Sequence, residues 1–471
     1  MSFKKKFYKN VAVVGGFSIL STIISFLSTI ITSRLLTPEE YGFVAMIMVF
    51  ISFANLFSDA GISFSIIRSD YHYTFQRAIS NLSFYIGIVL FILLSALSYP
   101  IALFYGDMKF ILPTIIAAST FIFKSQAIIP YAILSKELKF NYIGMVTFLS
   151  TLFSISLTII MAAFGFSYWA IILPQVLMVI FSATLLNIKA KFWFRFYPLV
   201  YVKAGFIRSK KLLWNLSAFN FINYWSRNAD NLIVGKFFGK YEIGIYGRAY
   251  KMLTYPLTLF QSLFGNVMLP SLKRLQQEKG DVQREFLNIL GVISIINLPI
   301  AGVFLLIPST FVKILWGNKW VDVGNLLPII GILVLLQTLN SVTGHLYLLF
   351  NHEKYLFRTG LYSSIVSVSS ILAGAFFSPW HILFFYSMSV AFFGLPLNFY
   401  YGFYKSFGYR IDQILKFWGP KIFLVSLMLC GIWLKINYII YIGFSLWTLN
   451  IIIEQRNEFG KLFTILKSKL S

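Results

Sequence analysis

The chain has 471 residues, of which 58% are hydrophobic and 19% aromatic, and only 12% carry a charge. A soluble globular protein carries about twice that charged fraction. The composition therefore excludes a soluble globular protein. The net charge is +24. Most of these cations lie between apolar runs, where they set membrane topology and meet anionic lipid, so we expect no nucleic-acid partner.

Apolar runs of about twenty residues, the length that crosses a bilayer as a helix, recur along the chain. We therefore predict an all-α integral membrane protein with about fourteen transmembrane helices. The first run follows a lysine-rich N-terminus, lacks a cleavage site and is interpreted as an uncleaved helix. The predicted spans are 11–33, 42–67, 80–104, 111–134, 142–164, 168–187, 213–235, 242–269, 287–315, 323–350, 357–377, 380–404, 417–435 and 437–453.

Lysine and arginine concentrate in alternate loops and in both tails, which predicts cytoplasmic N- and C-termini. The longest polar connection, Lys189 to Lys211, alternates basic and aromatic residues around Pro198. This pattern is typical of a segment that lies on anionic headgroups. A second basic loop runs from Lys273 to Arg284.

The sequence also repeats itself. The stretch from Arg34 to Gly42 aligns with the stretch from Lys236 to Gly244, about 200 residues later, and Tyr105-Gly106 aligns with Trp316-Gly317. Six spans precede the basic linker and six follow it, an arrangement known from transporters with parallel repeats. The predicted organisation is an N-terminal six-helix lobe (1–188), a cytoplasmic linker (189–212), a second six-helix lobe (213–405), and a C-terminal helix pair with a basic tail (406–471).

Polar side chains inside the first lobe mark candidate positions on a transport pathway. The first span carries a hydroxyl stripe that includes Ser25 and ends near Arg34. The stripe indicates either close helix packing or a cavity wall, and Arg34 either snorkels or faces the cavity. Asn55 and Asp59 share one face of the second span, where Asp59 either caps a helix end or couples an ion. Lys124 lies too deep in its span for easy snorkelling, which favours a cavity position.

The second lobe has more charge inside its spans. Asn223, Arg227 and Asp230 recur at helical spacing on one face, and Arg227 and Asp230 form either a local ion pair or part of a cavity wall. Arg248 and Lys251 form a basic pair one turn apart, with no acid nearby on their helix, which favours an anionic ligand. Three further polar residues are expected to line the cavity: Asn231, Gln337 and Asn340.

No catalytic or cofactor motif is found in the sequence. A phosphate-binding glycine loop, a His-Glu-x-x-His pair and a Gly-x-Ser-x-Gly elbow are all absent, and Cys430 is the only cysteine. We therefore expect no enzyme activity, no cofactor and no metal site. A coupling ion, H⁺ or Na⁺, remains compatible with the intramembrane acids.

Two stretches resemble Wzx-type polysaccharide flippases of the multidrug/oligosaccharidyl-lipid/polysaccharide exporter superfamily. They are SRLLTPEEYGFVAM with FSDAGISFSIIR in the first lobe, and ADNLIVGKFFGKYEIGIYGRAYKM in the second. The resemblance implies export of an undecaprenyl-diphosphate-linked oligosaccharide across the bacterial inner membrane through a cationic cavity. Glycosyltransferases and a polymerase are the implied partners, beside bilayer lipids. The implied cationic residues are Arg34, Lys124, Arg227, Arg248 and Lys251, with Asp59 and Asp230 as counter-ions or coupling sites.

Three alternatives stay open. A lipid II flippase fits the number of spans, although the first two helices have few arginines for that role. A cation-coupled drug antiporter fits the superfamily, although the internal charges are mainly basic. A membrane glycosyltransferase or polymerase would require a sizeable polar loop for its chemistry, and the sequence has none.

Overall fold

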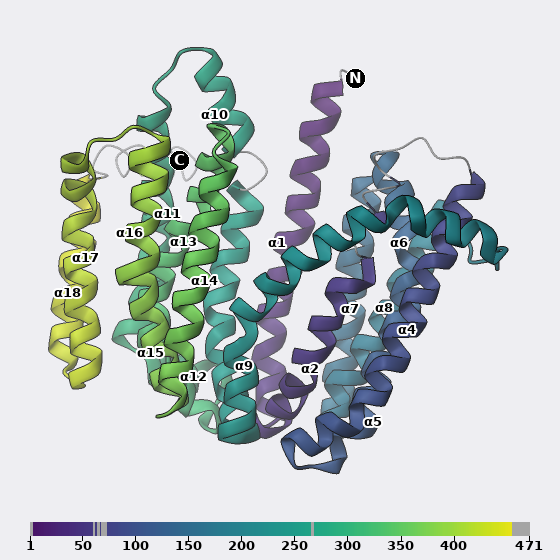
Figure 1. Cartoon of the computed structure of the whole chain (residues 1–471). Coiled ribbons are helices and arrows are strands. Elements are labelled where there is room, and N and C mark those ends of the chain that lie inside the picture. Colours follow the sequence, from purple (N-terminus) through teal and green to yellow (C-terminus); the bar gives the residue numbers. More distant parts are fainter. Residues whose placement is uncertain (1–2, 60–61, 64–65, 67–72, 265–267, 455–471) are drawn as a thin grey trace, which may run out of the picture. The chain divides into compact units, whose positions relative to one another are not determined.

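The computed structural model describes residues 3–59, 62–63, 66, 73–264 and 268–454 (Figure 1). Within these ranges the regular elements are helices, which confirms the all-α prediction. They are α1 (Phe3–Leu35), α2 (Pro38–Asp59), α4 (Tyr73–Tyr105), η1 (Met108–Phe110), α5 (Ile111–Ala118), α6 (Thr120–Lys136), α7 (Phe140–Ala163), α8 (Trp169–Ala190), α9 (Leu199–Phe264), α10 (Met268–Gln277), α11 (Val282–Leu306), α12 (Pro308–Trp316), η2 (Asn318–Asn325), α13 (Leu327–Leu349), α14 (Glu353–Ala375), α15 (Pro379–Ser389), η3 (Val390–Gly394), α16 (Leu395–Asn398), η4 (Phe399–Ser406), α17 (Ile411–Leu434) and α18 (Asn437–Glu454).

Eleven helical segments of the described part are long and apolar enough to cross a membrane. They coincide with eleven of the predicted spans, which confirms a multi-span membrane protein. Of the other three predicted spans, 213–235 lies within α9 and 437–453 within α18, and the described part of 242–269 lies in α9 and the start of α10. The total of fourteen therefore stays a prediction.

The chain folds into two compact units, residues 1–244 and 245–471. In the first unit α1 packs on α7, and α8 packs against α6 and α7, while α4 packs on α6. The turn from α1 to α2 is set by a local capping box, because Thr37 and Glu40 exchange hydrogen bonds: the backbone N–H of Thr37 donates to Glu40 Oε2 (2.7 Å) and that of Glu40 donates to Thr37 Oγ1 (3.3 Å). Pro38 occupies the first helical position, where its missing N–H costs nothing.

α9 is two helices joined at Gly239. This residue has φ 88° and ψ −175°, a conformation that only glycine adopts readily. The break falls inside the predicted turn between the spans 213–235 and 242–269. Residues up to 244 belong to the first unit, and the following helical segment belongs to the second.

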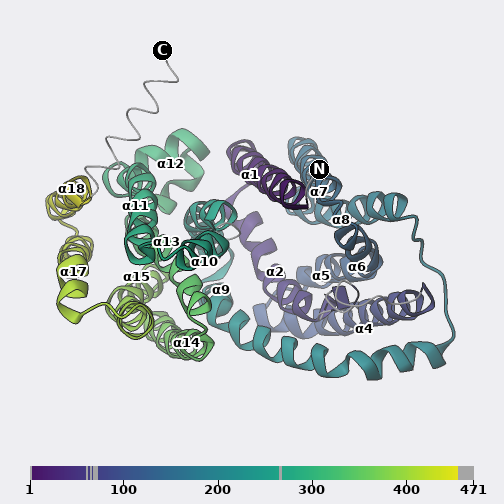
Figure 2. The same cartoon turned by 90° about the horizontal axis from the view of Figure 1, so that it is seen from above.

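In the second unit, α11 packs on α13 and α14 on α15, and α13 contributes an almost continuous buried surface. α17 and α18 lie side by side, and α18 packs on α11 (Figure 2). A hydrogen bond between the buried side chains of Asn297 and Thr338 joins α11 to α13. Such polar contacts hold helices together where lipid gives no hydrophobic drive for their association.

Two turns that align in the sequence repeat have the same form in the structure. α4 ends at Tyr105 and α12 ends at Trp316, and each is followed by a glycine with positive φ, Gly106 (74°) or Gly317 (85°). A short 3₁₀ helix then leads into the next span in both cases. The repeat therefore specifies a local structure that only glycine permits at this point.

Candidate functional site

The first unit holds a polar cluster between α2 and α6, inside predicted spans. Lys124 Nζ of α6 donates a 2.7 Å hydrogen bond to Asn55 Oδ1 of α2, and the lysine side chain is only partly buried. Asp59, one turn after Asn55 on α2, is close enough to attract the ammonium group electrostatically. The predicted lining residue Asn55, the predicted counter-ion Asp59 and the predicted deep lysine are therefore brought together. The amide engages one of the three ammonium protons and leaves capacity for an anion.

The carboxylate of Asp59 also has a local structural role. Its two oxygens accept hydrogen bonds from the backbone N–H (3.0 Å) and the hydroxyl (2.8 Å) of Ser63. This is the capping arrangement that the sequence left open as one of two readings. Both carboxylate oxygens of Asp59 are therefore engaged by hydrogen bonds from Ser63.

Several hydroxyls of the α1 stripe donate to carbonyl oxygens of the same helix. Ser28 Oγ donates to the carbonyl oxygen of Ser25 (2.8 Å), and Thr32 Oγ1 donates to that of Ser28 (2.9 Å). Thr32 Oγ1 also accepts a 2.7 Å hydrogen bond from the hydroxyl of Tyr41, which ties the end of α1 to α2. Arg34, at the end of the same helix, is exposed.

The part of α9 before Gly239 is fixed to α2. The hydroxyl of Tyr224 donates to the carbonyl oxygen of Val49, and the tyrosine ring packs on Phe53. Asp230 is 3% exposed and accepts hydrogen bonds from the backbone N–H (2.8 Å) and side-chain amide (3.3 Å) of Asn231. The side chains of Asn223 and Arg227, two predicted site residues, lie outside the described part of the chain.

The repeat-related turns, residues 34–42 and 236–244, meet through their backbones. A Cβ atom at Gly42 would lie 1.7 Å from the carbonyl oxygen of Lys240, and one at Gly244 would lie 2.0 Å from that of Pro38. These four residues are equivalent in pairs in the repeat, Gly42 with Gly244 and Pro38 with Lys240, so the contact is reciprocal. Only glycine permits so close an approach of two backbones.

An ion pair secures the same turn. Lys240 Nζ binds the carboxylate of Asp107, and the ammonium group lies 5.3 Å from the ring centre of Phe43 and 5.4 Å from that of Phe110. The hydrogen bond from Lys240, followed by that from the backbone N–H of Lys109, holds the pKa of Asp107 below its usual value. This carboxylate therefore stays charged at neutral pH and holds the turn after α4 to α9.

The basic pair after the break in α9 is split between two environments. Arg248 is 3% exposed, and its guanidinium lies 5.4 Å from the ring centre of Trp316 and 5.0 Å from that of Trp320. Two buried indole rings thus contact the cation, a geometry that stabilises positive charge. Lys251, one turn later, has an exposed side chain.

The predicted polar stripe of α13 is engaged in helix–helix hydrogen bonds. Gln337 Nε2 donates to the hydroxyl of Tyr386 in α15 (2.8 Å). Asn340 Oδ1 accepts from Asn398 Nδ2 (2.7 Å), and Asn398 Oδ1 accepts from the hydroxyl of Tyr347 (2.9 Å). The helical periodicity thus identified polar residues that share one face of α13, and in the structure they form hydrogen bonds to neighbouring helices of the second unit.

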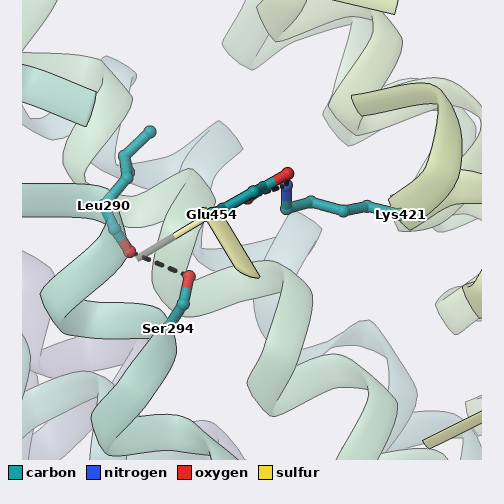
Figure 3. Close-up of polar contacts among 4 residues, drawn as sticks. All are labelled: Leu290, Ser294, Lys421 and Glu454. Atoms are coloured by element: carbon teal, nitrogen blue, oxygen red, sulfur yellow. Dashed lines mark hydrogen bonds and ion pairs between the residues drawn. The ribbon is translucent and has the colours of Figure 1, made fainter. Parts of the chain in front are cut away.

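One ion pair with a buried lysine was missed in the sequence. Lys421 of α17 is 3% exposed in its side chain, and its Nζ contacts Glu454 Oε1 and Oε2 at 2.7 and 2.6 Å (Figure 3). Glu454 is the last described residue of α18, so the pair joins the two C-terminal helices. In sequence the partners lie at separate helix positions with no periodic relation, and only the hairpin brings them together.

Comparisons with known proteins place this architecture. It is similar to the lipid II flippase MurJ in an inward closed conformation (TM-score 0.67, 15% identity, covering 94% of this chain and 99% of that one). It is also similar to an inward-facing multidrug-resistance transporter of the MATE family in the MOP superfamily (TM-score 0.64, 11% identity, covering 84% and 98%). The class defined by the fold is a multi-span membrane protein with the MurJ and MATE architecture.

The sequence comparisons name the family. A model described as "Polysaccharide biosynthesis protein" matches residues 31–325, so the chain belongs to that family. The chain is 26% identical to a membrane protein in the cps region of Klebsiella pneumoniae (68% of this chain, 66% of that protein). It is 23% identical to the lipopolysaccharide biosynthesis protein WzxC of Escherichia coli K12 (73% and 70%) and 25% to the teichuronic acid biosynthesis protein TuaB of Bacillus subtilis 168 (68% and 67%).

The aligned regions span about two thirds of these relatives. The predicted resemblance to Wzx-type polysaccharide flippases is confirmed at the level of the family.

Proposed function

We propose that the protein moves a lipid-linked oligosaccharide repeat unit across the bacterial inner membrane for the synthesis of a surface polysaccharide. Family membership and the likeness to WzxC and TuaB support a role in polysaccharide biosynthesis. The transporter fold supports translocation. The observation that carries the proposal for the site is the partly buried ammonium group of Lys124, which Asn55 holds in place between two spans.

The substrate we propose is an undecaprenyl-diphosphate-linked oligosaccharide. Its diphosphate carries about two negative charges, which hydrocarbon does not solvate. Lys124 replaces part of the lost water with charge-assisted hydrogen bonds, which are roughly twice as strong as neutral ones. The polyprenyl chain stays in lipid while the site is exposed to one side and then to the other.

Four further cations belong to the proposed binding surface: Arg34, Arg227, Arg248 and Lys251. Arg34 and Lys251 have exposed side chains, which are accessible to a ligand. The guanidinium of Arg248 packs against two tryptophans. We therefore propose that it attracts the anionic substrate through its charge and does not donate a hydrogen bond to it. Ser25, Asn55, Asn223 and Asn231 complete the polar lining.

We assign Asp230 to coupling. Asp230 is 3% exposed within a predicted span, and a buried acid at membrane depth is a candidate for ion coupling. H⁺ or Na⁺ is the proposed ion. Membrane potential is an additional drive, since each transferred charge contributes about 2.3 kcal/mol per 100 mV.

Replacement of Lys124 tests the site. Lys124→Gln removes the charge and keeps a hydrogen-bonding group, so we expect a loss of export of about tenfold or more, the equivalent of one hydrogen bond to a charged group. Surface polysaccharide and membrane-protein level are measured in cells that depend on this chain. Lys139→Gln is the matched control, because Lys139 pairs with Glu137 at an exposed turn.

Normal export by Lys124→Gln would contradict the assignment of the site. The cell phenotype separately tests the substrate class. Accumulation of lipid-linked repeat units, with intact cell shape, supports a polysaccharide flippase, whereas arrested peptidoglycan synthesis would indicate lipid II. The proposed partners are the glycosyltransferases that build the repeat unit and the polymerase that consumes it.

A further inference from the structure

Two side chains of α4 bind the connection between α8 and α9 along its length. Residues 192–198 run without regular structure between these helices. The side-chain amide of Asn81 donates a 2.8 Å hydrogen bond to the carbonyl oxygen of Arg195, and its oxygen accepts a 3.1 Å bond from the N–H of Tyr197. One side chain thus makes the pair of bonds that a neighbouring strand makes to alternate residues.

Arg77 secures the start of the same segment. Its Nη1 donates to the carbonyl oxygen of Trp193, and its guanidinium lies 4.3 Å from the ring centre of Phe192. Phe192 is itself 3% exposed, inside an apolar cluster formed with α4 and α6. Arg77 and Asn81 are both buried. The segment is therefore held by groups that are costly to leave unpaired.

With its backbone fixed, the segment presents a defined outer face. Trp193 and Phe196 are 54% and 76% exposed, and the side chains of Lys189, Lys191 and Arg195 are exposed as well. Within the described part of the chain these three cations have no acidic partner. Cations interleaved with exposed aromatic rings match the boundary between headgroups and acyl chains, where rings sit at the glycerol level and cations meet phosphate.

We propose that residues 189–197 form a preorganised binding surface for anionic phospholipid headgroups, with Arg77 and Asn81 as its positioning residues. The partner is the phosphodiester surface of the bilayer, because the aromatic rings need an apolar phase beside the phosphates. A single cation close to an anionic membrane contributes a preference of about fivefold. Three cations on a fixed backbone favour anionic over zwitterionic lipid without the entropy cost of ordering the segment.

Quenching of Trp193 fluorescence tests the proposal. The full-length protein is placed in nanodiscs of phosphatidylcholine and phosphatidylglycerol in which one lipid or the other carries brominated acyl chains, at equal mole fraction. The signal of Trp193 is the difference between wild type and Trp193→Phe, since the chain has ten tryptophans. We expect stronger quenching by brominated phosphatidylglycerol.

The charge variants give the decisive comparison. Lys189→Gln/Lys191→Gln/Arg195→Gln is expected to remove the preference while both lipids still quench. The control Lys273→Gln/Lys279→Gln/Arg284→Gln removes the same charge from another basic loop and is expected to leave the preference unchanged. Equal quenching by both lipids in the wild type would overturn headgroup selection. Absence of quenching by either lipid would overturn the membrane contact and indicate water or a protein partner.

Asn81→Ala tests the positioning role. The exposed cations remain, but the hydrogen bonds to Arg195 and Tyr197 are lost, so we expect a smaller lipid preference without a change in total charge. Circular dichroism and the thermal midpoint confirm that the helices are retained. An unaltered preference in a folded Asn81→Ala protein would show that the cations select lipid without this fixed backbone.

Discussion

Gly42→Ala is a direct test of the reciprocal contact between the turns 34–42 and 236–244. The new methyl group would lie 1.7 Å from the carbonyl oxygen of Lys240 and 2.7 Å from its carbonyl carbon. Ordinary contact begins at about 3.4 Å, and both clashing atoms belong to backbone, so no side-chain rotation relieves the overlap. The two turns must separate by well over an ångström. Overpacking of this kind costs about 1–3 kcal/mol.

The expected consequence is a weaker closed contact, which a buried reporter detects. Ile243 is 0% exposed, so Ile243→Cys in a Cys430→Ser background reacts with a thiol reagent only when the turn opens. Destabilisation by about 1–3 kcal/mol raises the labelling rate by roughly 5- to 150-fold. Gly244→Ala is expected to act in the same way, because its methyl group would lie 2.0 Å from the carbonyl oxygen of Pro38.

Gly247→Ala is the matched control for these glycine variants. It lies in the same helix with no atom within 4 Å of an added Cβ, so it should leave the labelling rate unchanged. Equal labelling of wild type, Gly42→Ala and Gly244→Ala would refute the reasoning. Rapid labelling of Gly247→Ala would show that the reporter responds to any added methyl group in this region and not to the contact.

The remaining predictions concern three other contacts. Glu454→Met leaves the buried ammonium group of Lys421 without its partner and should destabilise the C-terminal helix pair by about 3 kcal/mol, measured by thermal unfolding in detergent. Lys421→Met/Glu454→Met should recover most of the loss, and a double mutant as unstable as the single would contradict an ion-pair origin. Because the folded-state pKa of Asp107 is depressed, its contribution is present above the unfolded pKa of about 3.9 and is lost as pH falls through the folded value. Thermal stability should therefore fall more steeply below about pH 4 in the wild type than in Asp107→Asn, and an equally steep fall in Asp107→Asn would refute this cause. Cysteines placed in the 189–211 linker should resist an impermeant thiol reagent in intact cells, and labelling there would overturn the predicted cytoplasmic position.

The sequence alone determined the class of the fold and the place of its main turns. Unpaired backbone polar groups are costly in lipid, so apolar runs of about twenty residues cross the bilayer as helices. Eleven spans could therefore be predicted from the sequence. The two predicted spans 213–235 and 242–269 bracket the break that the structure places at Gly239, and the repeat aligned the turns at Gly106 and Gly317, where the backbone angles favour glycine. The repeat identified Gly42 and Gly244 as equivalent positions.

Only the tertiary structure decided which faces meet. Helical periodicity shows that Gln337 and Asn340 share a face, but the neighbouring helices determine that this face is packed. The same limit applies to Lys421 with Glu454, and to Asn81 with the backbone of Arg195. In each case the partner is supplied by another helix or a connecting segment, and its position depends on packing across the whole unit. The energies of these polar and ionic contacts cannot be predicted from local sequence, because they depend on the desolvation of groups that lie far apart in the chain.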